Sequence, residues 1–599
     1  MIESLVGAPV STSARARRLL LAITVLTAIT RWLGLSKTMW DWDEALFMLA
    51  LRHYDVSQHH PHPPGFPLFV GTAKLFTLVG FGDFHALQAV NLLAAVSIVP
   101  AMFLLARELR ASTGVSLAAS VLLAFFPNVW FYGGTGFSDV PSMVLVMLAV
   151  ALLLRGCRDP RWFLAGALIA GIAAGFRPQN LVIVFVPALL AAWFQWKRNR
   201  MVPVGALLIV LTIVGVSYAS AVSLTGGWDV YRQTVKMHQD YITRFDSFRS
   251  PGRPPLIHLF DDFFVRPYRA PVINAIVTIL ALGSFMSLLR RRLSVSLALA
   301  SFGPFCIVAW LLLDRFSVSR FSLGYAPLLA LLSADGIEVL TSARWRIGAA
   351  IATGTSLVMI YWSWPAMREV HRHESPPFAA ARWIRSNVNP RTTTLYVHEG
   401  MLPYTEVLLA EYAQRYLLDE TPPTSWASMR SGVFVKEGVS TSKKAHLFLR
   451  DRGQLFELAR QRYFEVTVVP MSDVVDFLDG WYAEESSGAG GWRWMGHRSR
   501  ALLPRSAGRA RLQLRLYVPL DALPIRPNIT VRVNGAVVDR FQATSSTLEK
   551  SYDVEGRGDA PNELLLETDR VVNPAAEKLR ADARDLGLRL DSIEWRKGP

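Results

Sequence analysis

Cysteine is scarce in this chain of 599 residues, which contains only two, Cys157 and Cys306. Both lie beside or within apolar stretches, and the long region from residue 365 to the C-terminus has none. That region therefore has neither a disulfide scaffold nor a zinc site built from cysteine thiolates.

Charged residues are also few, at 18% of the chain, whereas 51% of residues are hydrophobic and the mean hydropathy is +0.27. This composition excludes an ordinary soluble protein of this size and predicts several membrane-spanning segments. Acids are outnumbered, since 63 Lys and Arg against 47 Asp and Glu give a net charge of +16. Many basic residues separate apolar runs, which indicates inner loops near membrane lipids, and we expect no nucleic-acid partner.

Eleven apolar segments are long enough to cross a bilayer. A twelfth run, residues 66–80, contains Lys74 and spans about four helical turns, which is short for a hydrocarbon core of about 30 Å. The eleven segments lie near residues 19–35, 84–106, 113–131, 138–154, 162–176, 180–196, 203–224, 271–289, 294–313, 322–341 and 347–364.

Basic clusters decide between eleven and twelve crossings. With eleven crossings, all the clusters face the cytoplasm, whereas a crossing at 66–80 places the first cluster opposite the others. We therefore interpret 66–80 as a helix at the outer membrane surface, with a short tilted crossing as the alternative. The N-terminus is then cytoplasmic and residues 365–599 are exported. The clusters begin at Arg15, Arg107, Arg155, Lys197, Arg290 and Arg344.

The fold class predicted is a multi-span α-helical membrane protein with soluble C-terminal regions. We place the membrane domain at 1–365, a small exported α/β region at 366–475 and an exported β-sandwich or jelly roll at 476–599. Helical patterns at 375–388 and 405–417 alternate with short strand patterns in the α/β region. Alternating strands and the Asn534-Gly535 turn signal predict the sandwich.

Two acids, Asp43 and Glu44, follow the first crossing. A carboxylate that is partly desolvated beside a second acid suits a general base, although acids also simply mark such loops. Asp41, between two tryptophans, is interpreted as a solvated neighbour. Asp139 begins a later helix on the same predicted face, where helix capping is the alternative explanation.

Several cations share that face and are candidates for binding a phosphate. His62 precedes Pro63-Pro64-Gly65 at a helix start, which suits an anion, whereas a metal site with His59 and His60 is disfavoured by the neighbouring prolines. Arginine binds phosphate through its planar fork, although anchoring at the interface is the alternative for each one. The arginine candidates are Arg177 at a hairpin tip and Arg315 and Arg320 before the crossing 322–341.

The order of these motifs resembles the polytopic glycosyltransferases of the GT-C type, in particular bacterial relatives of protein O-mannosyltransferases and of the lipid A aminoarabinose transferase. The resemblance covers roughly residues 15–365. The features that carry it are Asp43-Glu44, the HPPG at 62–65, GFGDFHALQAVNLL, TGFSDVPSM, GFRPQ and the crossing R-F-x-L-x-x-A-P-L-L-A-L. The position of His62 is often lysine in relatives, and histidine is only partly charged at neutral pH.

The resemblance implies sugar transfer from a polyprenyl-phosphate donor to an acceptor hydroxyl at the outer face of the bacterial inner membrane, with inversion. Asp43 is the first candidate base and Asp139 the second, with Glu44 orienting the base or touching the sugar. Arg320 is the first candidate for stabilising the leaving phosphate, followed by Arg315, His62 and Arg177. A divalent metal is left open, as are the sugar, the acceptor and the oligomeric state.

Two other function classes compete with this hypothesis. A lipid-linked glycan transporter would show inverted repeats and charges near mid-membrane, whereas the charges here gather at one face. A non-catalytic membrane protein could instead bind glycan through its exported domains. Trp481, Trp492 and Trp494 are candidates for stacking on sugar rings, with core packing as the alternative.

Overall fold

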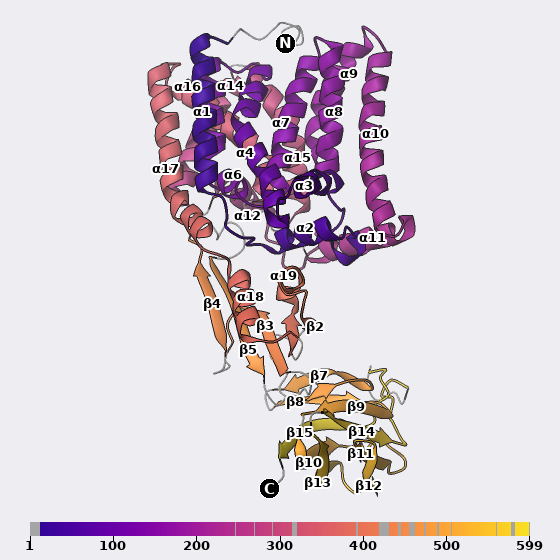
Figure 1. Ribbon diagram of the computed structural model, residues 1–599. Helices are drawn as coiled ribbons and strands as arrows, with labels where there is room; N and C mark the ends of the chain where they lie inside the picture. Colours follow the sequence, from indigo (N-terminus) through magenta and orange to yellow (C-terminus); the bar gives the residue numbers. More distant parts are fainter. Residues whose placement is uncertain are drawn as a thin grey trace. The chain divides into compact units, whose positions relative to one another are not determined.

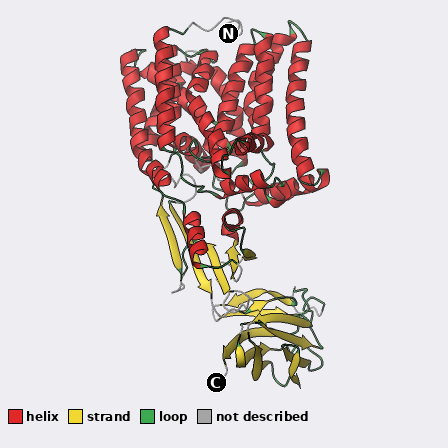
Figure 2. Ribbon diagram, in the orientation of Figure 1, coloured by secondary structure: helices red, strands yellow, loops and turns green. Residues whose placement is uncertain are grey.

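The computed structural model describes two compact units, one comprising Met1–Phe378 with Leu449–Phe464 and the other Ala379–Phe448 with Glu465–Pro599. The first is mainly helical and the second contains most of the strands (Figure 2). The described residues are 12–245, 247–268, 270–289, 292–313, 320–390, 393–417, 431–440, 445–453, 462–471, 475–487, 490–504, 506–558, 560–576 and 582–597.

Each predicted crossing coincides with a helix or a pair of helices in the first unit (Figure 1). The residues that begin these helices explain their positions, because Ser13, Ser112 and Asp159 accept a backbone amide at the N-cap. The helices are α1 Ala14–Leu33, α4 Asp83–Glu108, α5 Thr113–Phe125, α6 Pro127–Tyr132, α7 Asp139–Gly156, α8 Pro160–Phe176, α9 Asn180–Trp196, α10 Met201–Leu224, α13 Pro271–Gly283, α14 Phe285–Leu289, α15 Leu293–Leu312, α16 Ala326–Leu340 and α17 Trp345–Arg372.

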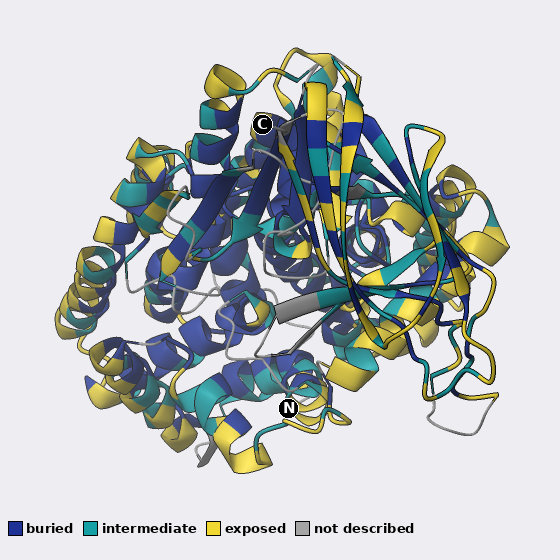
Figure 3. Cartoon of the chain, turned by 90° about the horizontal axis from the view of Figure 1, so that it is seen from below, coloured by how far each residue is buried: buried dark blue, intermediate teal, exposed yellow. Residues whose placement is uncertain are grey.

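Within the described residues, five helical segments are long and apolar enough to cross a membrane by length and composition alone. They are 83–108, 139–156, 201–224, 293–312 and the continuous stretch 345–387. Buried residues face the interior of this unit while many large apolar side chains remain exposed on its outer surface (Figure 3). That pattern is expected of helices that face lipid. The multi-span helical fold class is therefore confirmed, and the number of eleven crossings stays a prediction.

Short helices connect the long ones at one end of the first unit. The segment predicted to be a surface helix forms α3, Pro67–Leu78, which Figure 1 shows lying across the direction of the long helices. α11, Trp228–Phe245, lies in a similar way at the foot of α10. The other short helices here are α2 Trp42–Arg52, η2 Val56–Gln58, α12 Leu256–Phe260, η3 Asp261–Val265 and η4 Phe321–Gly324.

The second unit begins with a five-stranded sheet in the order β2-β1-β3-β5-β4, with the helix α18, Pro376–Asn387, near its start. The helix predicted over 405–417 is wrong in its second half. α19 ends at Leu408, and residues 413–417 form β2, because they pair in parallel with β1. The elements are β1 Thr393–His398, η5 Glu399–Met401, α19 Leu402–Leu408, β2 Ala413–Leu417, β3 Ser431–Glu437, β4 His446–Asp451 and β5 Tyr463–Met471.

The rest of the second unit is the predicted β-sandwich. Its sheets run β13-β10-β15-β8-β7 and β12-β11-β14-β9-β6, with a shared core that includes Leu512, Ile529 and Leu564. Asn534 and Gly535 both have positive φ in the turn from β11 to β12, as a two-residue hairpin requires. The strands are β6 Asp476–Phe477, β7 Trp481–Ser487, β8 Gly490–Met495, β9 Arg498–Leu503, β10 Ala507–Tyr517, β11 Asn528–Val533, β12 Ala536–Gln542, β13 Thr547–Arg557, β14 Asn562–Thr568 and β15 Arg589–Lys597.

Candidate active site

The first turn of α2 carries both predicted acids. Asp41 is the N-cap of this helix and accepts the backbone N–H of Asp43, while Glu44 bonds back to the N-cap backbone, so the two side chains form a capping box. Asp41 thus helps to begin the helix. The side chain of Asp43 projects from the first turn and is 16% exposed.

Glu44 is fully buried, and its carboxylate is bonded to the backbone on both sides. Oε2 accepts the N–H groups of Trp40 at 2.7 Å and Asp41 at 3.0 Å, and Oε1 accepts the N–H of Gly136 at 2.7 Å. Burial raises the pKa of Glu44 to about 7, and the three backbone N–H donors oppose that rise. Glu44 therefore joins α2 to the segment that precedes Asp139.

That segment, residues 132–136, is buried and is held by polar side chains of α4. Gln88 donates to the carbonyl of Gly134 at 2.9 Å, and Asn91 donates to the carbonyl of Thr135 at 2.7 Å. A side chain at position 134 would meet the carbonyl oxygen of Gly34 at 2.7 Å, so glycine is required for this close approach. The 132–136 segment is thus fixed in place just before the start of α7.

Two buried arginines meet two aspartates in front of this segment. Arg177 follows α8 and donates to Oδ2 of Asp139 at 2.7 Å and to Oγ of Ser138 at 3.0 Å. Arg320 donates from Nη1 to Oδ2 of Asp43 at 2.5 Å, and its Nε lies 3.7 Å from Oδ2 of Asp139. Asp139 therefore lies between the two guanidinium groups, which come from opposite sides of the site.

One of the two arginines, Arg320, has a buried donor that can meet a further acceptor. The side chains of Arg177 and Arg320 are only 9% and 14% exposed, and the buried Nε of Arg320 makes no hydrogen bond within the described part of the chain. A buried donor without a hydrogen bond costs free energy, so this position favours an anionic ligand. The ring of Phe137 lies 4.8 Å from the guanidinium carbon of Arg320 and holds its plane.

His62 lies beside Asp43, with its Nδ1 3.9 Å from Oδ1 of that residue. Its ring is packed among Phe47, Phe66 and His238 at centroid distances of 5.9, 4.8 and 6.3 Å. Burial lowers the pKa of His62 to about 4, although the Asp43 carboxylate acts in the opposite direction. A neutral imidazole results at pH 7, so His62 can serve as a hydrogen-bonding group there but not as the cation that the sequence suggests.

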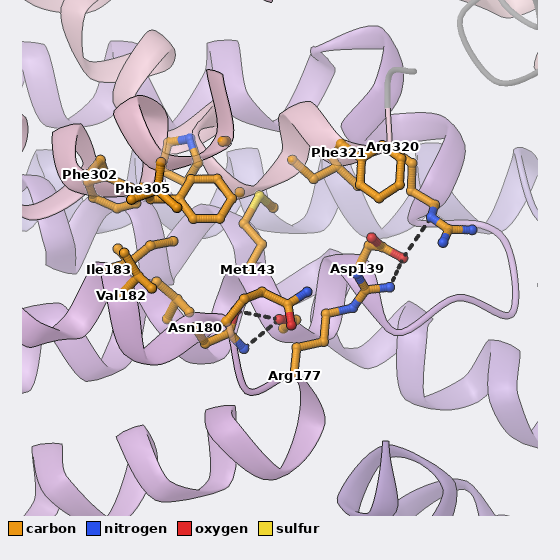
Figure 4. A pocket seen from close by; sticks show the side chains of 18 of the residues that line it. Asp139, Met143, Arg177, Asn180, Val182, Ile183, Phe302, Phe305, Arg320 and Phe321 are labelled. Atoms are coloured by element: carbon orange, nitrogen blue, oxygen red, sulfur yellow. Dashed lines mark hydrogen bonds and ion pairs between the residues drawn. The ribbon is translucent and has the colours of Figure 1, made fainter. Parts of the chain in front are cut away.

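A pocket of about 320 Å³ opens from this cluster between α7, α9, α15 and η4. Figure 4 shows Asp139, Arg177 and Arg320 at one end and apolar side chains, among them Ile183 and Phe302, at the other. Lining residues at the outer edge are exposed, with Val308 at 42%, Leu312 at 46% and Phe321 at 39%. The pocket therefore has a cationic end and a long apolar end that reaches the exposed apolar surface of the helices.

The remaining sequence candidates lie elsewhere. Arg315 falls outside the described residues. Trp481 packs against the sandwich core and donates its indole N–H to the carbonyl of Arg500 at 2.8 Å. Trp492 and Trp494 share one face of β8, where the guanidinium of Arg589 lies over both rings at 5.1 and 5.9 Å. A metal site is not formed by any three His, Cys, Asp or Glu side chains in the described ranges.

Sequence reasoning missed several residues that build this site. Asn180 lines the pocket and exchanges hydrogen bonds with Ser142, and Ser138 supports Arg177. His238 comes from α11, far along the chain from His62, so sequence proximity gives no signal for it. A signal did exist for Asn180, since an amide directly after the GFRPQ hairpin tip interrupts an apolar run.

Comparison with known proteins finds a family match that includes part of this site, with Asp43, Glu44 and Arg320 outside the matched residues. The family model for dolichyl-phosphate-mannose-protein mannosyltransferases matches residues 61–218, which include His62, Asp139 and Arg177. This match confirms the GT-C resemblance. The chain also aligns with a Dol-P-Glc:Glc(2)Man(9)GlcNAc(2)-PP-Dol alpha-1,2-glucosyltransferase of Yarrowia lipolytica, at 30% identity over 165 residues, or 26% of this chain. That alignment spans 31% of the length of the curated relative.

Two solved structures also align with the chain, each with a TM-score below 0.5. ArnT from Cupriavidus metallidurans in the apo state has a TM-score of 0.49 and 13% identity, over 76% of this chain and 98% of that one. Arabinofuranosyltransferase AftD from Mycobacteria has a TM-score of 0.43 and 11% identity, over 98% of this chain and 62% of that one.

Proposed function

We propose that the protein is an integral membrane glycosyltransferase that transfers a sugar from a polyprenyl-phosphate donor to an acceptor hydroxyl, with inversion. The observation that carries this proposal is the pocket with Arg177 and Arg320 at one end and apolar walls along the rest. The family match over 61–218 supports the same class of reaction.

The two ends of the pocket suit the two parts of such a donor. Arginine forms strong, directional hydrogen bonds with phosphate oxygens, and here the guanidinium groups of Arg177 and Arg320 both lie beside Asp139 in the lining of the pocket. The apolar walls formed by α9 and α15 suit a prenyl chain, which reaches them from the exposed apolar surface around Val308 and Leu312. A soluble sugar nucleotide would gain nothing from those walls.

Asp43 is the proposed general base. The acceptor hydroxyl loses its proton to the Asp43 carboxylate through Oδ1, the oxygen that faces His62. The acceptor oxygen forms a bond to the anomeric carbon while the bond from that carbon to the phosphate oxygen breaks, and the electron pair leaves with the phosphate. Arg320 and Arg177 stabilise the charge that grows on the leaving phosphate.

Other residues position these groups. Asp139 lies between the two guanidinium groups and sets their spacing, so we assign it to holding the arginines rather than to taking the acceptor proton. Glu44 fixes α2 against the 132–136 segment through backbone bonds, which agrees with an orienting role. His62 lies within reach of the sugar side as a neutral donor or acceptor.

The location of the reaction follows from the charge pattern. Arg15, Arg107 and Arg155 lie near helix ends opposite to the end that carries Asp43 and Asp139, so the site faces away from the basic inner loops. We therefore propose a bacterial inner-membrane protein with a cytoplasmic N-terminus, an external site and exported C-terminal regions.

The experiment is sugar transfer by the purified protein from a polyprenyl-phosphate sugar to a panel of acceptors. Asp43→Asn is expected to lower the turnover number by about 10² or more, with the donor affinity retained. Arg320→Ala is expected to weaken donor binding by about tenfold or more, because an ion pair to phosphate is lost.

Asp229→Asn and Arg232→Ala are matched controls, since both residues are exposed on α11. Normal turnover in Asp43→Asn would remove that residue as the base. Failure of the wild-type protein to transfer sugar from every donor tested, together with tight donor binding, would favour transport over catalysis.

A further inference from the structure

A second pocket of about 550 Å³ lies between η3 and one face of α13. Its wall on α13 is formed by residues 271, 274, 275 and 278, which share one side of a helix by their spacing. The opposite wall is formed by Asp262, Val265 and Arg266. Figure 1 shows α12, which leads into η3, at the same end of the helical unit as α2.

The two pockets have a common partition. The hydroxyl of Tyr325 donates to the carbonyl of Phe263 in η3 at 2.5 Å. Tyr325 directly follows Gly324, which lines the first pocket, and Phe263 directly follows Asp262, which lines the second. Ligands in the two pockets would therefore bind on either side of this hydrogen bond between Tyr325 and η3.

The polar groups of the second pocket differ from those of the first. Arg266 is paired with Asp261 and lies 3.9 Å from Oδ1 of Asp262. Among the described residues at the mouth of this pocket, the positive charge of Arg266 is therefore balanced by nearby carboxylates. Asn274 Oδ1 accepts the backbone N–H of Tyr268 at 2.9 Å, and the Thr278 hydroxyl donates to the carbonyl of Val265 at 3.1 Å, so the Asn274 NH₂ group and the Thr278 oxygen are the groups that can meet a ligand. A mixture of donors and acceptors with little net positive charge suits the hydroxyl groups of a sugar better than a phosphate.

The apolar part of this pocket is continuous with the surface that faces lipid. Ile279, which lines it, is 62% exposed, and its neighbours on α13, Val272 and Leu282, are 64% and 56% exposed. An apolar wall that opens to the bilayer beside a polar mouth fits an amphiphile with its chain along α13.

We propose that this second pocket binds a glycolipid, whose sugar head bears the acceptor hydroxyl for the reaction above. The acceptor class is then a membrane-borne glycan rather than a soluble protein, and this assignment of the acceptor depends on the proposed function. Binding of the glycolipid itself does not depend on it.

The test uses the full-length protein in phosphatidylcholine nanodiscs and a monoglycosyl diacylglycerol with a photoactivatable diazirine in its acyl chain. Ala275→Trp fills the pocket from an exposed position, and Leu207→Trp adds the same side chain at an exposed position on α10, away from both pockets. We expect labelling to fall about tenfold in Ala275→Trp and to stay within about twofold in Leu207→Trp. Asp262→Ala, at a partly exposed carboxylate, is expected to lower labelling by about threefold or more.

Competition identifies the ligand class. Unlabelled glycolipid is expected to compete, whereas equal mole fractions of phosphatidylglycerol and a soluble methyl glycoside are not. Equal labelling of Ala275→Trp and wild type would overturn the site. Competition by phosphatidylglycerol as strong as that by glycolipid would overturn the sugar specificity, and competition by the methyl glycoside would overturn the need for a lipid chain.

A transfer assay separates this inference from the proposed function. Ala275→Trp should bind polyprenyl phosphate as tightly as wild type but transfer sugar to a glycolipid about tenfold more slowly. Wild-type transfer in that variant would overturn the acceptor assignment and leave the glycosyltransferase standing. Specific glycolipid labelling without any transfer by the wild-type protein would contradict the proposed function and leave the site standing.

Discussion

At the scale of single residues, Glu44 ties α2 to the segment before α7 through hydrogen bonds to the backbone. Its two oxygens accept three backbone N–H groups, from Trp40, Asp41 and Gly136. Glutamine has one acceptor oxygen and an NH₂ group that donates, so it cannot serve all three. The neighbouring Asp43 depends on this arrangement for its position.

Glu44→Gln should therefore destabilise the protein by about 1–3 kcal/mol for each backbone donor left unpaired. We also expect a lower turnover number with donor affinity unchanged, because Asp43 moves while the two arginines do not. Thermal unfolding and transfer kinetics measure the two effects. Loss of activity without any loss of stability would instead indicate that Glu44 acts directly on the substrate.

His62 predicts a dependence of stability on pH. Burial lowers its pKa to about 4 in the folded protein, below the usual value of about 6.5. The folded state therefore binds this proton less readily than the unfolded state, so stability is present above pH 6.5 and is lost as the pH falls towards 4.

His62→Gln should make the unfolding free energy less sensitive to pH between about 6.5 and 4. Exposed His53 supplies the control substitution His53→Gln. The measurement is chemical denaturation at several pH values. An unchanged slope in His62→Gln would show that another group controls stability in acid.

The sequence predicted individual site residues better than it predicted their partners. Asp43, Asp139, Arg177 and Arg320 were found from motif order, and the structure brings them together. What motif order cannot give is pairing, because the contact of Arg320 with Asp43 joins residues 277 positions apart. The neutral state of His62 was also beyond reach, since it arises from burial among Phe47 and Phe66.

At the scale of secondary-structure elements, the position of α3 distinguishes the arrangement with eleven crossings from one in which this helix is a twelfth crossing. Charge parity predicts that this helix lies at the outer surface, and its 12 residues are short for a crossing. Gly71 is exposed on it, and a Cβ there meets no atom within 4 Å. A cysteine at this position is thus tolerated and accessible.

Gly71→Cys should react with a membrane-impermeant thiol reagent applied from outside intact cells. Both native cysteines are buried, so the background is expected to be low. Arg161→Cys, near the start of α8, should react only after the membrane is opened. Labelling of Gly71→Cys only from the cytoplasmic side would exclude the arrangement with eleven crossings.

The long apolar helices were predicted correctly from their hydrophobicity. The structures of β2 and α2, which depend on contacts with other parts of the chain, were not. The long apolar helices follow from hydropathy alone. Residues 413–417 carry a helical pattern but form β2, because backbone pairing with β1 outweighs local propensity. α2 was missed because eight of its 11 residues are buried, which leaves no amphipathic stripe to recognise.

At the scale of the whole molecule, the sandwich has a core of its own. The cluster that includes Leu512, Ile529 and Leu564 lies entirely within the second unit. Every described residue that lines the first pocket lies within the first unit. Donor binding should therefore not require the sandwich.

A chain that ends at residue 475 should bind a polyprenyl phosphate within about twofold of the full-length protein, since the pocket residues and the core of the sandwich belong to different compact units. Donor binding in detergent measures this, and transfer to a glycan acceptor shows whether the sandwich contributes to acceptor use. A large loss of donor affinity would show that the sandwich supports the membrane unit.

The first pocket opens toward the apolar outer surface of the helices, and this affects the concentration unit in which its affinity for a lipid donor must be expressed. Because Val308, Leu312 and Phe321, which line it, are exposed, the proposed lipid donor would reach the arginines by diffusing in the plane of the membrane. The rate should then follow the mole fraction of donor in the bilayer or micelle, and diluting the donor with inert lipid should slow the reaction at constant bulk molarity. Competitive inhibitors of this site should accordingly be amphiphiles that partition into membranes.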